Sequence, residues 1–387
     1  MINTLTIYTT ELDDENKAIQ DITSQLKFEH GIPQNVIGII TCHYEFILSG
    51  VYQAICKVLP FDTVGTISSA QSFHSQTDLL LLTILIISSD DVEFDIIKTE
   101  SLIDSSPDIM VKNAYQTSKR ESSKPALILT FSPFIPQNCG DVYVNALDEV
   151  SGGVPLFGTL AIDDTLDFSN CFMIHNGEYY KDRMAMVLIY GNIQPKFYVA
   201  NMSESKIIGK SALITKSAGP VLMEVNNHHV MDYFIDLGLA KASEQQYAMV
   251  TIPFLLDYND GTPKVSKIFV MLTENKHALC AGIMPEGSTI YMTKADEQDI
   301  INTTSLALDK MLPDFEKASV LLIYTCIARY LTLGALQFKE MELVKNRINN
   351  QLPYIMINSG GEICPTQVSD GKAINRFHNN TFVACLF

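Results

Sequence analysis

The sequence lacks an apolar run long enough to cross a membrane. The densest run is LLLLTILII, from Leu79 to Ile87, and a membrane-spanning helix needs about 20 such residues. Its leucine and β-branched residues are typical of a buried strand. The start of the chain, MINTLTIYTTELDDENK, has no basic stretch before its apolar residues, so we expect no signal peptide. We therefore expect a soluble cytoplasmic protein with no membrane insertion.

The sequence also has few positive charges for its length. It holds 27 lysines and arginines against 44 aspartates and glutamates, and the formal net charge is −17. A protein that binds nucleic acid contacts phosphates through a lysine-rich and arginine-rich surface. We therefore expect no nucleic-acid partner.

Paired cysteines and the common catalytic fingerprints are absent as well. None of the eight cysteines forms a C-x-x-C pair, and there is no H-x-x-x-H spacing, so neither a metal site nor covalently attached haem is expected. The nucleophile elbow G-x-S-x-G, the Walker A motif and the Rossmann fingerprint are missing too. We expect most of the cysteines to be small buried apolar side chains of a protein in a reducing compartment.

What the sequence does contain is a pattern that occurs three times. Each copy has an apolar run, a Cys or Ser, a helical pattern, a proline and a second short apolar run; the copies span Asn35–Ala70, Ala126–Asp164 and Val320–Pro365. The pattern predicts a buried strand, a crossover helix and a second strand. Identity between the copies is low, so an ordinary α/β protein without a repeat would give a similar pattern.

The stretches between these copies are rich in strand patterns and turn signals. Helical patterns also cover Gly219–Ala240 and Asp296–Leu312. We predict a mixed α/β (α+β) fold, in which two domains have largely β-sheet cores flanked by helices and built from strand–helix–strand repeats. The predicted domains are residues 1–204 and 205–387, since the strand-rich half ends near residue 205.

The third copy carries the most conspicuous candidate site. In LLIYTCIARYLTLG, Cys326 ends an apolar run and Arg329 follows it. Strand ends are common ligand sites in α/β folds, where an arginine can bind a carboxylate or phosphate with two hydrogen bonds. A nearby arginine can also activate a cysteine nucleophile. The third possibility is a purely structural role, with a buried cysteine beside an arginine that pairs with Glu340 or Glu362. All three interpretations stay open.

Two further features bear on this site. In SGGEICP, Gly360 and Gly361 permit close backbone approach, which can direct Glu362 into a pocket; a tight turn with a solvent-facing glutamate fits equally. His175 and His378 are the candidate axial ligands if haem binds, because each adjoins an apolar run. Each also fits an ordinary hydrogen-bonding histidine.

The C-terminal third resembles the FIST (F-box and intracellular signal transduction) family. The similar strings are CIARYLTLG, KEME, LPYIMINSGGEICP and FHNNTFVACLF, in that order. Upstream, IMPEGSTIYM, PLFGTLAIDD and HNGEYY are similar to further family elements, although Thr159 stands where the family has a glycine. The positions that match the family's motifs are Cys326, Arg329, Glu340, Glu342, Gly361, Glu362, Ile363, Pro365 and Asn379, with Thr381 or its neighbour Asn380. Of these, the predicted ligand-binding residues are Cys326, Arg329, Glu340, Gly361, Glu362 and Asn379.

The resemblance implies a FIST N-type domain followed by a FIST C-type domain, in a stand-alone protein of the bacterial type. Such domains are proposed to bind small ligands in signalling pathways, and some members bind haem and sense nitric oxide. The implied output partner is a separate signalling protein, such as a histidine kinase or a cyclic-dinucleotide enzyme. The other hypotheses are a cysteine-dependent hydrolase or transferase that uses Cys326, and an interaction scaffold without a pocket.

Overall fold

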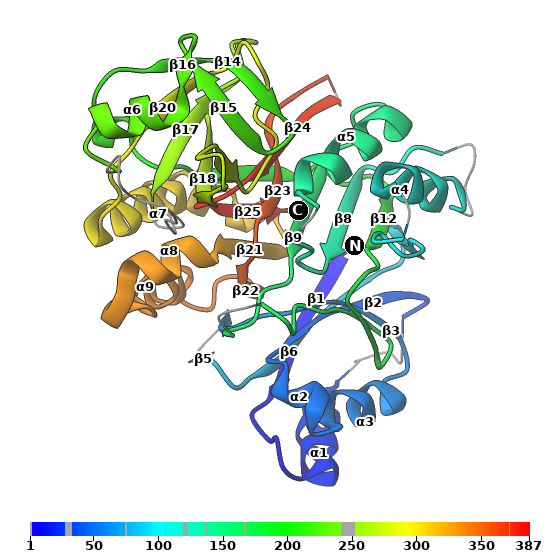
Figure 1. Ribbon diagram of the computed structural model, residues 1–387. Coiled ribbons are helices and arrows are strands. Elements are labelled where there is room, and N and C mark those ends of the chain that lie inside the picture. The colour runs from blue at the N-terminus through cyan, green and yellow to red at the C-terminus, as the bar shows by residue number, and fades with distance from the viewer. Residues whose placement is uncertain are drawn as a thin grey trace.

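The structure is a computed structural model of the chain. It describes residues 2–27, 33–73, 76–104, 106–118, 123–136, 138–165, 168–240, 252–370 and 372–387. Within this part, the chain forms three units of the same design around one core, and a β-barrel is inserted into the third unit (Figure 1).

Each unit runs through the same order of elements: a strand, a helix, a strand, one or two helices, a strand, an antiparallel strand pair, which is short in the first two units, and a closing strand. The first unit consists of β1 (Ile2–Thr9), α1 (Glu15–Gln25), β2 (Asn35–Cys42), α2 (Glu45–Leu48), α3 (Val51–Val58), β3 (Asp62–Ile67), β4 (Gln71–Phe73), β5 (Gln76–Asp78) and β6 (Leu82–Ser89). The second consists of β7 (Glu93–Lys98), α4 (Pro107–Gln116), β8 (Leu127–Ser132), α5 (Gly140–Ser151), β9 (Leu156–Leu160), β10 (Met173–His175), β11 (Glu178–Tyr180) and β12 (Ala185–Tyr190).

The third unit is interrupted after its first strand. It consists of β13 (Lys196–Ala200), α7 (Glu297–Met311), β21 (Leu321–Cys326), α8 (Ile327–Leu333), α9 (Lys339–Ile348), β22 (Tyr354–Ser359), β23 (Glu362–Ser369), β24 (Lys372–His378) and β25 (Phe382–Leu386). The insertion consists of β14 (Ala212–Ala218), β15 (Val221–Val225), β16 (His228–His229), α6 (Val230–Asp236), β17 (Pro253–Asp257), β18 (Val265–Leu272), β19 (Ala278–Cys280) and β20 (Thr289–Met292). Because β14 pairs with both β20 and β15, the inserted sheet closes into a barrel.

Each unit contributes one parallel strand pair, with a crossover helix between its strands. These pairs are β2–β3, β8–β9 and β21–β22. They are the strands predicted from the three sequence copies, so the repeat and the mixed α/β class are confirmed. The run Leu79–Ile87 largely becomes β6, whose side chains are all buried, as the sequence predicts.

The three units are joined by an exchange of their antiparallel strand pairs. The first unit's β4 pairs with β22, the second unit's β10 pairs with β3, and the third unit's β23 pairs with β9. The resulting sheets have the orders β1-β6-β2-β3-β10-β11, β7-β12-β8-β9-β23-β24 and β13-β25-β21-β22-β4-β5. Two of these sheets combine strands from both sides of residue 204, and the predicted domain boundary there stays a prediction.

The inward faces of the three sheets share one apolar core. Ile39 and Val64 meet Leu129, Phe157 and their neighbours in it, together with Tyr324, Ile357 and Val383 of the third sheet. Alternate residues face outward, where the helices cover them at three corners of the molecule (Figure 1). Both faces of the sheets are therefore buried, which explains the nearly continuous apolar runs of the central strands.

One predicted helix is wrong. Gly219–Ala240 forms β15, β16 and only the short helix α6. Asn226 and Asn227 have positive φ angles of 52° and 62° and make the turn between the two strands. Asparagine adopts this conformation more readily than most residues, so it interrupts the helical pattern. The described helices include none that is both long enough and apolar enough to cross a membrane.

Candidate functional site

A buried polar cluster lies where the parallel strands of the third unit end. We call it the strand-end cluster and define it as Cys326, Ser359, Gly361, Glu362, Asn379 and Thr381. Cys326 and Ser359 end the paired strands β21 and β22, and the amide of Cys326 donates to the carbonyl of Thr381 at 2.9 Å. The Ser359 hydroxyl donates to the Gly361 carbonyl at 2.7 Å. The structure thus brings four predicted site residues together: Cys326, Gly361, Glu362 and Asn379.

Glu362 is completely buried and only half satisfied. Its Oε2 accepts a hydrogen bond of 2.6 Å from the Thr381 hydroxyl, while its Oε1 has no partner in the part of the chain that the structure describes. Desolvation raises the pKa of this carboxyl to about 8, against smaller opposing effects of Thr381, Ser359 and Arg329. Most of the Glu362 side chains are therefore protonated at neutral pH.

Asn379 is buried at the turn between β24 and β25. Its backbone amide donates to the Ser266 carbonyl of β18 at 3.0 Å. Neither its Oδ1 nor its Nδ2 has a hydrogen-bond partner among the described residues. A buried amide without partners costs about 1–3 kcal/mol for each unpaired group, so this side chain is a candidate for contact with a ligand.

Gly361 is required at its position for two reasons. Its φ of +155° is one that residues with a side chain rarely adopt. A Cβ atom here would lie 2.4 Å from the Phe377 ring and 3.2 Å from Asn379 Nδ2. The glycine therefore lets the chain pass close to Asn379 and places Glu362 in the cluster.

Cys326 is buried against Ile268 of the barrel and Ala328 of α8. Burial raises the pKa of its thiol well above the ordinary value, and the Glu362 carboxylate raises it further. A cysteine nucleophile needs a lowered pKa and access to solvent. The surroundings of Cys326 favour a wall residue over a nucleophile.

We expect Cys326 to react slowly with iodoacetamide. In the folded chain its labelling should be at least about 100-fold slower than in the urea-unfolded chain. The reason is that a local opening, which costs about 3 kcal/mol of free energy, must expose the thiol first. Mass spectrometry of tryptic peptides would follow each cysteine separately, with the half-buried Cys56 and Cys139 as internal controls. Labelling of Cys326 ahead of both controls would contradict this assignment.

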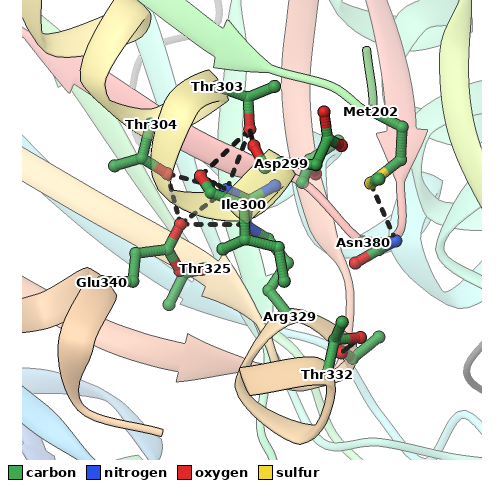
Figure 2. Close-up of polar contacts among 12 residues, drawn as sticks. Met202, Asp299, Ile300, Thr303, Thr304, Thr325, Arg329, Thr332, Glu340 and Asn380 are labelled. Atoms are coloured by element: carbon green, nitrogen blue, oxygen red, sulfur yellow. Dashed lines mark hydrogen bonds and ion pairs between the residues drawn. The ribbon is translucent and has the colours of Figure 1, made fainter. Parts of the chain in front are cut away.

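Arg329 and Glu340 form a separate buried ion pair (Figure 2). Arg329 donates from Nε and Nη2 to Glu340 Oε1 at 2.9 and 2.6 Å. Nη2 also contacts the Thr304 hydroxyl at 2.7 Å, and Glu340 Oε2 accepts from Thr325 at 2.6 Å. This pairing with Glu340 is the one that the purely structural interpretation of Arg329 predicts. Arg329 Nη1 has no hydrogen-bond partner within the described ranges.

The ion pair and the strand-end cluster lie on opposite faces of one sheet. Thr325 and Cys326 are consecutive in β21 and therefore point to opposite sides. Thr325 faces the helices and binds Glu340, whereas Cys326 has the same orientation as Tyr324 of the central core. Arg329 and Glu340 thus support the cluster from behind, and their predicted role as ligand contacts stays a prediction.

The two candidate haem ligands lie apart from each other. His378 is completely buried, its Nε2 lies 3.0 Å from the Cys364 carbonyl, and desolvation lowers its pKa to about 3. His175 lies in β10 of another sheet, where burial and Lys98 lower its pKa. Neither is among the residues that line four surface cavities of about 250 to 740 Å³ in the described part of the chain. Haem binding stays a prediction.

The barrel covers the strand-end cluster and is fixed to the second unit by a buried ion pair. Lys267 of β18 is completely buried, and its Nζ lies 3.1 Å from Asp141 Oδ2 in the first turn of α5. Asp141 also accepts from the Ile283 amide at 2.8 Å, and Lys267 lies 4.9 Å from the centre of the Phe377 ring. Its neighbours in β18, Ser266 and Ile268, contact Asn379 and Cys326.

Sequence reasoning missed several of these residues. Lys267 and Asp141 belong to no motif, and only a lone lysine in the strand pattern SKIFVML hints at a buried partner. Ser359 and Thr381 lie inside the strings that resemble the family, but neither was predicted to bind a ligand. Thr159, where the family has a glycine, donates its hydroxyl hydrogen to Ser359 at 2.8 Å and so belongs to the edge of the cluster.

Together, these features define an α/β protein with a buried candidate small-molecule site at the carboxyl ends of parallel strands, the usual place for ligands in such folds. The sequence matches the FIST N domain over residues 36–228 and the FIST C domain over residues 229–365. The chain therefore belongs to the FIST family, which is associated with signal transduction and the sensing of small ligands. A search of curated proteins found no match.

The border between the two family models lies inside the barrel, between the two histidines of β16. The N-terminal model thus covers most of the first two units and the first two strands of the barrel, and the C-terminal model covers the rest of the barrel and most of the third unit. The C-terminal model includes Cys326, Ser359, Gly361 and Glu362 of the strand-end cluster and the contacting strand β18, whereas Asn379 and Thr381 lie beyond its last residue, 365.

Proposed function

We propose that the chain is a cytoplasmic sensory protein of a signal transduction pathway that binds a small ligand at the strand-end cluster. It acts on a separate output partner, such as a histidine kinase or a cyclic-dinucleotide enzyme. The observation that carries the proposal is the set of buried, unpartnered polar atoms on Glu362 and Asn379. Membership of a family associated with ligand sensing supports it.

The energetic reason lies in those unpartnered atoms. Native proteins pair nearly all buried polar groups, and each exception costs about 1–3 kcal/mol. Oε1 of Glu362 and both polar atoms of the Asn379 side chain are three such exceptions in one cluster, counted over the described residues. A ligand that pairs with them recovers this free energy, whereas an apolar ligand does not.

The barrel provides the route from ligand to output. β18 contacts the cluster through Ser266 and Ile268 and is tied to α5 through Lys267. A ligand that alters the position of Asn379 therefore alters the position of the barrel relative to the strand-end cluster. Such a ligand shifts the protein between states only if it binds them with different affinity, and the barrel surface is the part that the partner would detect.

A thermal-shift screen of amines, amino acids, carboxylates, sugars and haemin tests the proposal. A ligand at about 100 times its dissociation constant adds about 2.7 kcal/mol to the stability. We expect at least one compound to raise the melting temperature of the wild type, and of Asn302→Ala, a matched control on the exposed face of α7. The same compound should have no effect on Asn379→Ala.

Two outcomes would contradict the proposal. One is that no class of compound shifts the melting temperature. The other is a shift of the same size in all three proteins, because the compound would then bind away from Asn379.

A further inference from the structure

Four members of the strand-end cluster belong to a larger polar layer, to which all three sheets contribute; these members are Cys326, Ser359, Glu362 and Thr381. Each member lies two residues along its strand from a residue of the central core, for example Thr66 beside Val64 and Thr381 beside Val383. Since alternate residues of a strand share a face, these side chains all point toward the axis that the three sheets surround. We call this set the polar end layer: Thr41, Thr66, Thr83, Thr159, Cys326, Ser359, Glu362 and Thr381.

Four atoms of this layer have no hydrogen-bond partner among the residues that the structure describes. They are the hydroxyl oxygens of Thr41, Thr66 and Thr83 and Oε1 of Glu362, and all four side chains are buried. The three threonines are cross-strand neighbours, because Thr41 pairs with both Thr66 and Thr83. Glu362 pairs with Thr159 on the neighbouring sheet. The unpartnered atoms are thus all oxygens, three on one sheet and one on a second, and each lies one step along its strand face from the core that the sheets share.

The charge of the layer limits what it can bind. The carboxyl of Glu362 has no cation of its own, since Arg329 pairs with Glu340 behind the sheet and Lys267 pairs with Asp141. An anionic ligand would meet no free positive charge within the layer and would lie beside Glu362. A buried carboxylate is stabilised by a cation, and the threonine hydroxyls beside it, which can both donate and accept, can accept hydrogen bonds from the N–H donors of that cation.

We propose that the polar end layer binds the ammonium group of a small primary amine, whose three N–H donors find their acceptors among Glu362 Oε1 and the hydroxyl oxygens of Thr41, Thr66 and Thr83. This assignment rests on the proposed function and names its ligand class. It differs from the sequence-based interpretation in which Arg329 binds a carboxylate or a phosphate. An ammonium group has three N–H donors, which leaves the rest of the molecule free to contact Asn379.

Proton release provides a distinctive signature of this binding mode. Desolvation holds the free protein's Glu362 largely protonated at neutral pH, and a bound ammonium group favours the carboxylate. Binding at pH 7 therefore releases a proton from the carboxyl. Titration calorimetry in buffers of different ionisation enthalpy would measure it.

The test uses the full chain and methylammonium chloride, with potassium chloride and sodium acetate at the same ionic strength. We expect methylammonium to raise the melting temperature of the wild type in a saturable manner and to release a proton. Glu342→Gln, an exposed substitution on α9 that changes the charge equally, should behave like the wild type. Glu362→Gln should lose the response, and Thr66→Val, with one acceptor fewer, should weaken it about tenfold.

Several results would overturn the assignment. They are an equal response to potassium chloride, an equal response to acetate, and an undiminished response of Glu362→Gln. If methylammonium fails while another compound binds in a manner that depends on Asn379, the ammonium assignment is wrong and the proposed function stands. If no compound of any class binds, both are wrong.

Discussion

Raising the pH from about 5 to about 8 is expected to cost the folded chain about 3.5 kcal/mol of stability through Glu362 alone. Burial raises the pKa of this carboxyl from 4.5 to about 8 in the folded state. Between these values the folded chain holds a proton that the unfolded chain has released. The stabilising contribution is therefore complete below pH 4.5 and is lost as the pH rises through about 8.

Urea unfolding of the wild type and Glu362→Gln across this pH range isolates the effect. Glutamine resembles the protonated carboxyl in shape and charge, so the variant keeps the neutral side chain but not its titration. The difference in unfolding free energy between the two proteins should change steadily from about pH 5 to about pH 8. The ionisable neighbours Cys326, Cys364 and Arg329 are common to both proteins. A difference that is constant over this range would contradict the buried, unpaired position of Glu362.

Replacing Glu340 by glutamine is expected to destabilise the fold by about 3–5 kcal/mol, because it leaves the Arg329 guanidinium buried without its counter-ion. Both side chains are almost completely buried, and Glu340 also accepts hydrogen bonds from Thr304 and Thr325. Chemical denaturation would measure the change. Glu342→Gln is the matched control: it lies two residues further along α9 and is exposed, so it should change the stability by less than about 0.5 kcal/mol.

The double variant Arg329→Met, Glu340→Leu separates the cost of an unpaired charge from the value of the pair. Replacing a whole buried ion pair by apolar residues is often neutral or stabilising. We therefore expect the double variant to be more stable than Glu340→Gln. If Glu340→Gln alone unfolds like the wild type, the pair does not support the strand-end cluster in the way described.

The three repeated strands were predictable because both of their faces are buried. Such strands are nearly continuous apolar runs, and these stand out in the sequence between turn signals. The exchange of antiparallel strand pairs between units was not predictable. Strands such as β4 and β10 have only three residues each, too few to show a period, and their partners are chosen by tertiary packing.

The candidate site was predictable in part. The motif spacing led to Cys326, Gly361, Glu362 and Asn379, which the structure brings together. The side of the sheet on which Arg329 lies was not predictable, because it depends on how α8 leaves β21. Thr41, Thr66 and Thr83 were missed because threonine is an ordinary strand residue. The three threonines are neighbours on one sheet, and only the packing of the three sheets on one core relates them to Glu362.

The most direct test of the central claim is mass spectrometry of the small molecules that the protein retains when purified without refolding. The claim is that the strand-end cluster holds a small ligand through Glu362 and Asn379. We predict a molecule at a fixed stoichiometry in the wild type and in Asn302→Ala, and its loss from Asn379→Ala and Glu362→Gln. A molecule retained equally by all four proteins, or none in any of them, would contradict the claim.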